Sequence, residues 1–382
     1  MGFHEFSSPY DWSRIAAYKR TAKAAFGGMI DLSVGSPVDP VPDSVRKALA
    51  VAANDPNAYG YPATAGTADL RAAIAEWFSA TRNVDLQAIH ADVVPTVGSK
   101  EGVALMASLL HFGEDDVVVQ PKVSYPTYEI GTQLAGAQVL KVDDVADVAS
   151  WRNVPGVKAV WVNSPCNPTG EVYSAERMAG IVAAAREIGA MVLSDECYAL
   201  MQWRGATNSA DDDPLQSTPC ALRSDVCAGS AEGVLVLYSL SKQSNMAGYR
   251  TAFIAGDESL IASMSAYRKQ IGQIIPGPVQ AAMAAGLRDL ESVKVQHARY
   301  RERLGVLVSA LRAYGYCTDM PDGALYVWVR AKSGDCWTDM EQLAKIGIIA
   351  SPGEFYGAPE CLRFSATASD EAIASAAERL AR

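Results

Sequence analysis

From about residue 66, the chain alternates amphipathic helical segments with short apolar runs. In residues 67–81, the apolar side chains of Leu70, Ile74 and Trp77 recur on one helical face. The sequence predicts helices at 67–81, 100–112, 128–135 and 174–188, and strands at 93–97, 117–120, 138–142, 157–163, 190–194 and 234–239. Continuous apolar strands between helices are typical of a mostly parallel sheet covered on both faces. We therefore expect functional side chains at the carboxyl ends of the strands.

Both ends of the chain depart from this alternation. The N-terminal end carries an aromatic arm, then a short strand near Asp31 and a helix at 42–53. Beyond a break at 275–278, the pattern predicts one long helix at 281–314 and strands near 324–329 and 361–365. The expected division is an arm and part of a small domain at 1–45, a large domain at 46–280, and the rest of the small domain at 281–382.

Residues 203–232 interrupt the pattern with a long polar stretch that contains Asp211-Asp212-Asp213-Pro214. We expect a solvated surface insertion here, with a lid or a partner contact as the alternative.

Composition narrows the classes of function. The 382 residues are 49% hydrophobic and 20% charged, with a net charge of −10, which argues against a nucleic-acid partner. Seven irregularly spaced cysteines and four scattered histidines favour neither a disulfide framework nor a metal site. Since no signal-peptide pattern or membrane-length apolar run is visible, we expect a cytoplasmic protein with reduced cysteines.

The most informative chemical pattern is Ser239-x-x-Lys242, directly after the strand at 234–239, with Arg250 eight residues further on. A lysine amine can form a Schiff base with an aldehyde, while a serine hydroxyl and a guanidinium can hold a phosphate. Pyridoxal phosphate (PLP) carries both groups. Taken alone, Lys242 could equally be a surface lysine in a polar loop.

Polar residues also follow two other predicted strands. Asn167, in Asn-Pro-Thr-Gly, and Tyr198 can each donate a hydrogen bond to a phenolate oxygen such as that of PLP. Asp195 ends a buried strand, where an acid is costly unless it is paired, and a pyridinium nitrogen would pair it. In isolation, these residues also fit an ordinary turn or a helix N-cap.

Three further features complete the set. Ser99 and Lys100 open a helix, whose free backbone N–H groups can bind a phosphate, or they form a plain capping turn. Tyr125 could cover a pyridine ring or simply pack. Arg363 stands alone in an apolar strand, suited to a bidentate grip on a carboxylate or to a structural ion pair.

The order and spacing of these motifs resemble those of the class I/II aminotransferases, over nearly the whole chain. The resemblance implies the α/β fold type I of PLP-dependent transferases, with a mostly parallel seven-stranded sheet between helices and a smaller α+β domain from both chain ends. It implies that the catalytic residues are Lys242, Asp195 and Tyr198, with Lys242 as the Schiff-base lysine, and that the substrate is bound by Arg363, Gly35 and Asn167. It implies these contacts to the cofactor: Ser99, Lys100, Ser239 and Arg250 around the phosphate; Asp195 on the ring nitrogen; Asn167 and Tyr198 on the ring oxygen; Tyr125 on the ring; and Tyr61 from the neighbouring subunit of a homodimer.

Several stretches are similar to the actinobacterial N-succinyldiaminopimelate aminotransferases of lysine biosynthesis, among them 3–6, 32–42 and 352–357. This similarity implies glutamate and 2-oxoglutarate as one substrate pair and N-succinyl-2-amino-6-oxopimelate as the acceptor. Arg20, Lys122 and Arg268 are candidates for binding its anionic tail. An aminotransferase for aspartate or a broad amino-acid set, and a PLP-dependent β-lyase, remain alternatives. A PLP-binding regulator is disfavoured, because the pattern begins near residue 30 and the chain is acidic.

Overall fold

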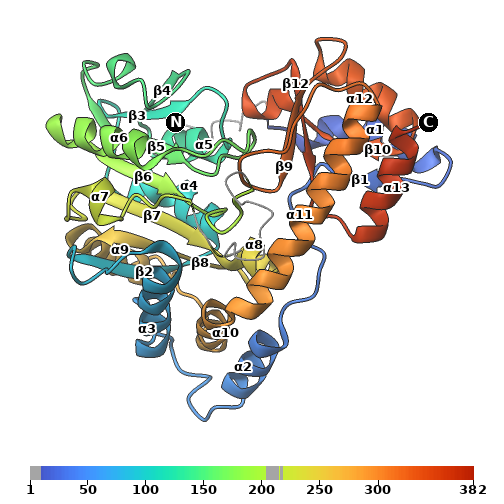
Figure 1. The fold of residues 1–382 in the computed structure, drawn as a ribbon. Helices are drawn as coiled ribbons and strands as arrows, with labels where there is room; N and C mark the ends of the chain where they lie inside the picture. Colours follow the sequence, from blue (N-terminus) through green and yellow to red (C-terminus); the bar gives the residue numbers. More distant parts are fainter. Residues whose placement is uncertain (1–9, 204–214, 216–217) are drawn as a thin grey trace, which may run out of the picture.

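The computed structural model describes residues 10–203, 215 and 218–382. Its centre is a seven-stranded sheet in the order β2-β8-β7-β6-β5-β3-β4 (Figure 1). The strands are β2 Ala91–Val97, β3 Val117–Pro121, β4 Gln138–Val142, β5 Val157–Asn163, β6 Met191–Asp195, β7 Val234–Ser239 and β8 Thr251–Asp257. Adjacent strands from β4 to β7 pair in parallel, and β8 is antiparallel to both of its neighbours. The mostly parallel seven-stranded sheet predicted from the sequence is confirmed.

Strand β8 was not predicted, although it runs between two strands of the sheet. Its end is unusual, since Gly256 has φ +150° and lies against β7. A Cβ at this position would come within 2.0 Å of the carbonyl oxygen of Val234. Only glycine fits this close approach of the two backbones.

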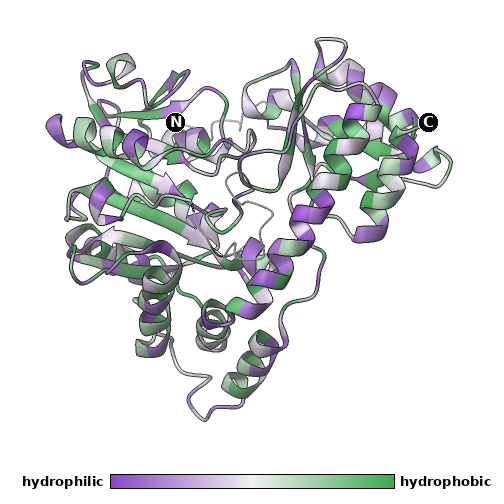
Figure 2. Cartoon of the chain, viewed as in Figure 1, coloured by the Kyte–Doolittle hydropathy of each residue, from purple (hydrophilic) through white to green (hydrophobic). Residues whose placement is uncertain are grey.

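Helices cover the sheet, and alternate residues of one strand enter different cores. Val192 and Val236 belong to one hydrophobic cluster, whereas Leu193 and Leu235, their neighbours in sequence, belong to another. Figure 2 shows the apolar colouring of the central strands. The helices of this part are α2 Asp43–Ala53, α3 Ala68–Trp77, α4 Ser99–Leu109, α5 Thr127–Leu134, α6 Ala175–Glu187, α7 Ser224–Cys227, α8 Leu240–Gln243, α9 Glu258–Gln270 and α10 Gly277–Arg288.

The two ends of the chain build a second, smaller body beside the large sheet (Figure 1). A parallel pair, β1 with β10, joins residues 30–31 to residues 348–349, and a three-stranded antiparallel sheet has the order β11-β12-β9. Its elements are α1 Ala16–Ala24, β1 Ile30–Asp31, α11 Leu290–Ala313, β9 Tyr326–Arg330, α12 Cys336–Lys345, β10 Ile348–Ile349, β11 Ser351–Pro352, β12 Cys361–Ser365 and α13 Asp370–Leu380. The expected α+β part, formed by both chain ends, is therefore present.

The single long helix predicted at 281–314 is wrong. Helix α10 ends at Arg288, and α11 begins at Leu290. Between them, Asp289 leaves the helical conformation, and its carboxylate accepts a hydrogen bond from the backbone N–H of Ser292 at 3.0 Å. An aspartate N-cap starts the second helix at this point, which hydrophobic periodicity alone did not reveal.

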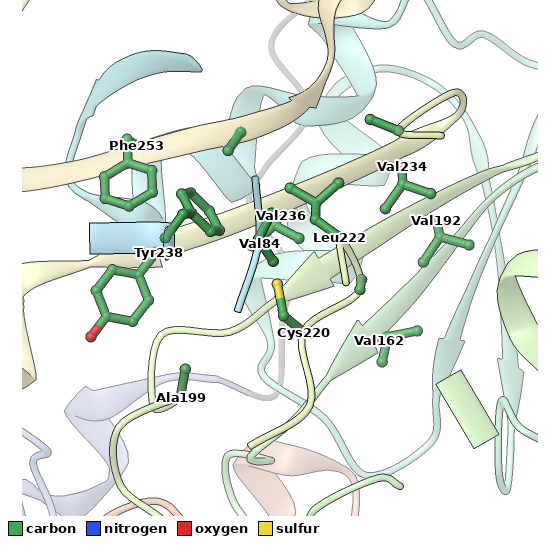
Figure 3. Packing of buried hydrophobic residues seen from close by; sticks show 14 of the residues in the cluster. Val84, Val162, Val192, Ala199, Cys220, Leu222, Val234, Val236, Tyr238 and Phe253 are labelled. Carbon is green, nitrogen blue, oxygen red and sulfur yellow. The ribbon is translucent and has the colours of Figure 1, made fainter. Parts of the chain in front are cut away.

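The solvated insertion predicted at 203–232 is also wrong for most of its described part. Cys220, Leu222 and Val226 are fully or nearly fully buried. Figure 3 shows Cys220 and Leu222 among valines of the sheet. The acidic stretch Asp211–Pro214 lies outside the described residues. The prediction was made from the polar character of residues 203–232 as a whole. The acidic stretch dominates that character, although apolar residues follow it.

Among the helices of residues 10–203 and 218–382, none combines the length and the apolar character needed to cross a membrane.

Candidate active site

A cavity of about 370 Å³ lies between the carboxyl ends of the central strands and the second body. All but one of the site residues predicted from the sequence line it. They are Gly35, Ser99, Lys100, Tyr125, Asn167, Asp195, Tyr198, Ser239, Lys242, Arg250 and Arg363. These residues come from positions as far apart as 35 and 363. They are distant in the sequence and are brought together only by the fold.

Lys242 lies on α8, the short helix directly after β7. The side chain of Ser239 caps this helix, with its Oγ accepting from the backbone N–H of Ser241 at 3.1 Å. The amine of Lys242 donates a hydrogen bond to the carbonyl oxygen of Gly35. Burial lowers the pKa of Lys242, so its amine gives up a proton more readily than that of an exposed lysine. This is the property required of a nucleophilic or basic lysine.

Asp195 is the last residue of β6, and it lines the cavity. It accepts hydrogen bonds from the hydroxyl of Tyr128 at 2.8 Å and from the backbone N–H of Cys197 at 3.2 Å. Burial raises the pKa of Asp195, and no Lys or Arg of the described residues forms an ion pair with it. The carboxylate is thus a buried acid held by neutral donors, in a position to receive a cationic group.

Tyr128 was not predicted as a site residue. It lies on α5, three residues after Tyr125, and its ring stacks on Trp161 with a centroid distance of 4.5 Å. Its position three residues after Tyr125, which lines the cavity, was the available signal.

One end of the cavity is built to hold an anion. Helix α4 begins at Ser99, so its first backbone N–H groups have no partner within the helix. Arg250 adopts a left-handed conformation with φ +57°, which brings its guanidinium next to Gly98. A Cβ on Gly98 would lie only 2.2 Å from Nη2 of Arg250. Burial and the charge of Arg250 lower the pKa of Lys100, consistent with positive charge concentrated here.

Arg363 defines another part of the cavity. Its Nη1 donates to Oδ1 of Asn167 at 2.7 Å, and its Nη2 donates to the carbonyl oxygen of Ser33 at 2.7 Å. Its Nε is buried and has no hydrogen-bond partner in the described part of the chain. Within that part, it forms no ion pair with a carboxylate either. A structural ion pair, one interpretation of this arginine, is therefore not observed.

Aromatic side chains form the remaining walls. Tyr326 of β9 lines the cavity, and its hydroxyl lies 2.6 Å from that of Tyr198. Tyr10 and Trp12, from the N-terminal arm, also line it and pack against Phe355. None of Tyr10, Trp12 or Tyr326 was predicted as a site residue. Tyr326 lies in an apolar strand, where an aromatic side chain looks like core, and the N-terminal arm carries no local feature that places it at a cavity.

Tyr61 is the predicted site residue that the structure does not bring to the cavity. Its side chain is fully exposed, at 103% relative accessibility, in the segment between α2 and α3. Its predicted role in a neighbouring subunit stays a prediction.

The three cations considered for an anionic tail do not line the cavity. Arg268 is buried and pairs with Glu101 at 2.8 Å, whereas Lys122 pairs with Asp143 at 2.8 Å on the surface. Arg20 is exposed. Among the described residues of one chain, four cations line the cavity: Lys100, Lys242, Arg250 and Arg363.

Comparison with known proteins agrees with this arrangement. Residues 27–380 match the family Aminotransferase class I and II. The chain therefore belongs to the class I and II aminotransferases, and it is a transaminase. It is 40% identical to the 4-dedimethylamino-4-oxo-anhydrotetracycline transaminase OxyQ of Streptomyces rimosus, over 97% of this chain and 98% of that protein.

Two further relatives bear on its specificity. The chain is 40% identical to a probable aminotransferase of Mycobacterium tuberculosis, over 97% of this chain and 84% of that protein. Among solved structures, it resembles a probable N-succinyldiaminopimelate aminotransferase of Thermus thermophilus, with a TM-score of 0.84 and 27% identity over 97% of this chain and 99% of that one.

The cofactor of this family is PLP, and the cavity fits it. The end of the cavity at Gly98 suits a phosphate: the guanidinium of Arg250 lies where any side chain at residue 98 would collide with it, beside the free N–H groups at the start of α4. The buried Asp195, which has only neutral hydrogen-bond donors, suits a protonated ring nitrogen. Lys242 provides the amine that the aldehyde of PLP requires.

Proposed function

We propose that the protein transfers the amino group of glutamate to N-succinyl-2-amino-6-oxopimelate, the transamination step of the diaminopimelate route to lysine. The supporting observation is the cavity that joins Lys242, Asp195 and Arg363, an arginine that has no carboxylate partner in the described part of the chain and whose buried Nε has no hydrogen-bond partner there. The structural neighbour named for N-succinyldiaminopimelate supports the choice of acceptor. We also propose that the protein acts in the cytoplasm.

Bound PLP supplies an aldehyde for the amino group and a ring that accepts the electrons left on the substrate Cα when that atom loses its proton. Lys242 is the base that removes the Cα proton, because burial lowers the pKa of its amine. Arg363 binds the α-carboxylate, beside Gly35, and so orients Cα towards Lys242.

The other lining residues hold the cofactor. Asp195 keeps the ring nitrogen protonated, and Asn167 and Tyr198 donate hydrogen bonds to the ring oxygen. Tyr125, which lines the cavity, would cover the ring of the cofactor. The phosphate is held by the following residues: Ser99, Lys100, Ser239 and Arg250.

We propose further that the protein works as a homodimer, in which Tyr61 reaches the phosphate of the neighbouring site. Val51, Tyr59 and Tyr61 are exposed at 74%, 90% and 103%, and such a group of apolar side chains is typical of a subunit interface. Each subunit would comprise a large domain at 46–280 and a small domain from 1–45 and 281–382.

A second candidate acceptor is a ring ketone of the kind named for OxyQ. The higher identity to OxyQ, 40% against 27% for the Thermus protein, favours it. The aromatic walls at Tyr10, Trp12 and Tyr326 would suit a fused-ring substrate.

A half-reaction distinguishes these functions. The PLP-loaded protein is mixed separately with glutamate, N-succinyl-diaminopimelate, aspartate or cystathionine, and the visible absorption of PLP is followed. Loss of the band with glutamate and N-succinyl-diaminopimelate, and little loss with aspartate, supports the proposal. Conversion by aspartate or many amino acids, or by glutamate without N-succinyl-diaminopimelate, contradicts the proposed acceptor. Pyruvate release from cystathionine would identify a β-lyase.

A further inference from the structure

Two buried hydroxyl groups from different bodies of the molecule meet in the cavity. Tyr198 follows β6 of the large sheet, whereas Tyr326 begins β9 of the second body. Their hydroxyl oxygens lie 2.6 Å apart, and both side chains are buried, at 7% and 2% exposure. None of the roles proposed above uses the hydroxyl of Tyr326.

The surroundings of Tyr326 show how closely its hydroxyl is fitted. A Cβ on Gly35 would come within 2.2 Å of that hydroxyl oxygen and 2.9 Å of the ring carbon that carries it. The same Gly35 accepts the hydrogen bond from the amine of Lys242 through its carbonyl oxygen. The Tyr326 hydroxyl therefore lies where Tyr198, Gly35 and Lys242 converge, and the absence of a side chain at residue 35 makes room for it.

By geometry alone, either hydroxyl can be the donor of this hydrogen bond. Each hydroxyl can donate one hydrogen bond, so only one of the two tyrosines donates to the other. The guanidinium of Arg363 lies 4.0 Å from the centre of the Tyr326 ring. A cation over the ring draws electron density from it, which makes the Tyr326 hydroxyl the stronger donor. When Tyr326 is the donor of this hydrogen bond, the proton of Tyr198 is left to be donated to another group.

We propose that Tyr326 is a positioning residue, which donates its hydroxyl proton to Tyr198 and thereby directs the Tyr198 proton into the cavity, towards the ring oxygen of the cofactor. This inference rests on the proposed function, because it assigns a target to the Tyr198 proton. It also means that the second body contributes to the electronic state of the cofactor, and not only to binding of the substrate carboxylate.

The test is a pH titration of the visible spectrum of the PLP-loaded protein. A hydrogen bond donated to the ring oxygen stabilises its anionic form, so weakening that bond makes the bound cofactor hold its proton to higher pH. In Tyr326→Phe, we expect the titration midpoint to rise by roughly half a unit to one unit, the size of one lost hydrogen bond. Tyr316→Phe is the matched control, since its buried hydroxyl donates to Asp339 at 2.8 Å, away from the cavity.

A double variant tests whether Tyr326 acts through Tyr198. Tyr198→Phe should raise the midpoint on its own, and adding Tyr326→Phe should raise it no further. An unchanged midpoint in Tyr326→Phe, or an equal added shift in the Tyr198→Phe background, would overturn the proposal. Failure of the proposed function would be seen in a different result: the wild-type protein would bind PLP, but glutamate would not convert the bound PLP.

A second measurement needs no cofactor. In the apoprotein, Gly35→Ala should lower the thermal unfolding midpoint, because its Cβ meets the Tyr326 hydroxyl. The same substitution in a Tyr326→Phe background should lower the midpoint less, since the closest atom has been removed. Equal losses in both backgrounds would contradict the close approach on which the proposal depends.

Discussion

The guanidinium of Arg363 donates a hydrogen bond to the side-chain oxygen of Asn167 at 2.7 Å, and this bond joins the two bodies of the molecule at the cavity. Because Oδ1 of Asn167 accepts from Arg363, the NH₂ end of the amide is the end available to donate to another group. The proposed ligand of the substrate carboxylate therefore also fixes the orientation of a proposed ligand of the cofactor.

Replacing Arg363 with lysine tests this arrangement. An ammonium group cannot bind Asn167, the carbonyl of Ser33 and a carboxylate with the geometry of a planar guanidinium. We expect kcat/KM for glutamate to fall by about 2–4 kcal/mol of transition-state stabilisation, with a strong rise in KM. Steady-state kinetics measures both quantities. Arg330→Lys, at an exposed position of the neighbouring strand, is the control and should change neither, whereas an unchanged KM in Arg363→Lys would refute its role.

Lys242→Ala should abolish steady-state transamination while the protein remains folded. Removal of a general base costs about 100- to 10,000-fold in rate, and loss of the amine that binds the aldehyde adds to this cost. Activity and far-UV circular dichroism are compared with those of Lys269→Ala, which alters an exposed lysine on α9. Substantial turnover by Lys242→Ala would show that another residue carries the reaction.

Asp195→Asn should slow transamination by about 100-fold or more, because it removes the charge that would hold the ring nitrogen protonated. The same substitution should stabilise the apoprotein against unfolding, although it lowers activity. Burial raises the pKa of Asp195 above its ordinary value. At pH values between the pKa of Asp195 in the unfolded state and that in the folded state, the folded state binds more protons, so its stability falls as the pH rises.

At about pH 7, Asp195→Asn should therefore make the apoprotein more stable than wild type, and the difference should shrink as the pH falls towards about 4. Urea unfolding at several pH values measures this trend. A variant less stable than wild type at neutral pH would mean that the carboxylate is already compensated in the folded chain.

Glu196→Gln should strongly destabilise the fold. Glu196 and Arg82 form an ion pair in which both side chains have zero exposure. The other oxygen of Glu196 accepts from Ser194 and from the backbone of Ala221. Loss of one partner leaves a buried guanidinium without its counter-charge, which costs about 3–5 kcal/mol of unfolding free energy.

The control for this stability measurement is Asp43→Asn, which breaks the exposed pair with Arg46. An exposed pair contributes little, so its loss should leave the unfolding free energy nearly unchanged. Equal effects of the two variants would mean that burial does not govern these interactions.

Tyr61→Phe tests the proposed contribution of a neighbouring subunit. If the hydroxyl binds the phosphate across the interface, the dissociation constant of PLP should rise by about tenfold, the value of a hydrogen bond to a charged group. Tyr59→Phe, also exposed, is the matched control. Equal PLP affinities in both variants, or a monomer in sedimentation equilibrium, would contradict the proposal.

Much of the large sheet could be predicted from the sequence. The run at 138–142 matches β4, which is an edge strand and is only partly buried. The runs at 157–163 and 234–239 match β5 and β7, because a buried parallel strand is apolar along most of its length. The polar motifs after such strands then met at one edge of the sheet, as the geometry of parallel strands requires.

Other parts depended on contacts between distant residues. Tyr326 and Tyr198 are separated by more than a hundred positions, and a tyrosine within an apolar strand has no sequence feature that marks it as part of a cavity. The buried pair of Arg82 and Glu196 was missed for the same reason. Local periodicity and turn chemistry describe one element at a time, whereas these contacts exist only after the elements have packed.

The pairing of β1 with β10 has a consequence for synthesis of the chain. Residues 30–31 leave the ribosome long before their partners at 348–349 are made. At roughly 5–20 residues per second, translation of the intervening chain takes more than about 15 seconds. During that time, Ile30 and Leu32 have no completed core to enter, although the strands of the large sheet are already available. The N-terminal segment is therefore the part of the nascent protein most in need of protection from aggregation, and the cavity can be completed only after the last strand has been translated.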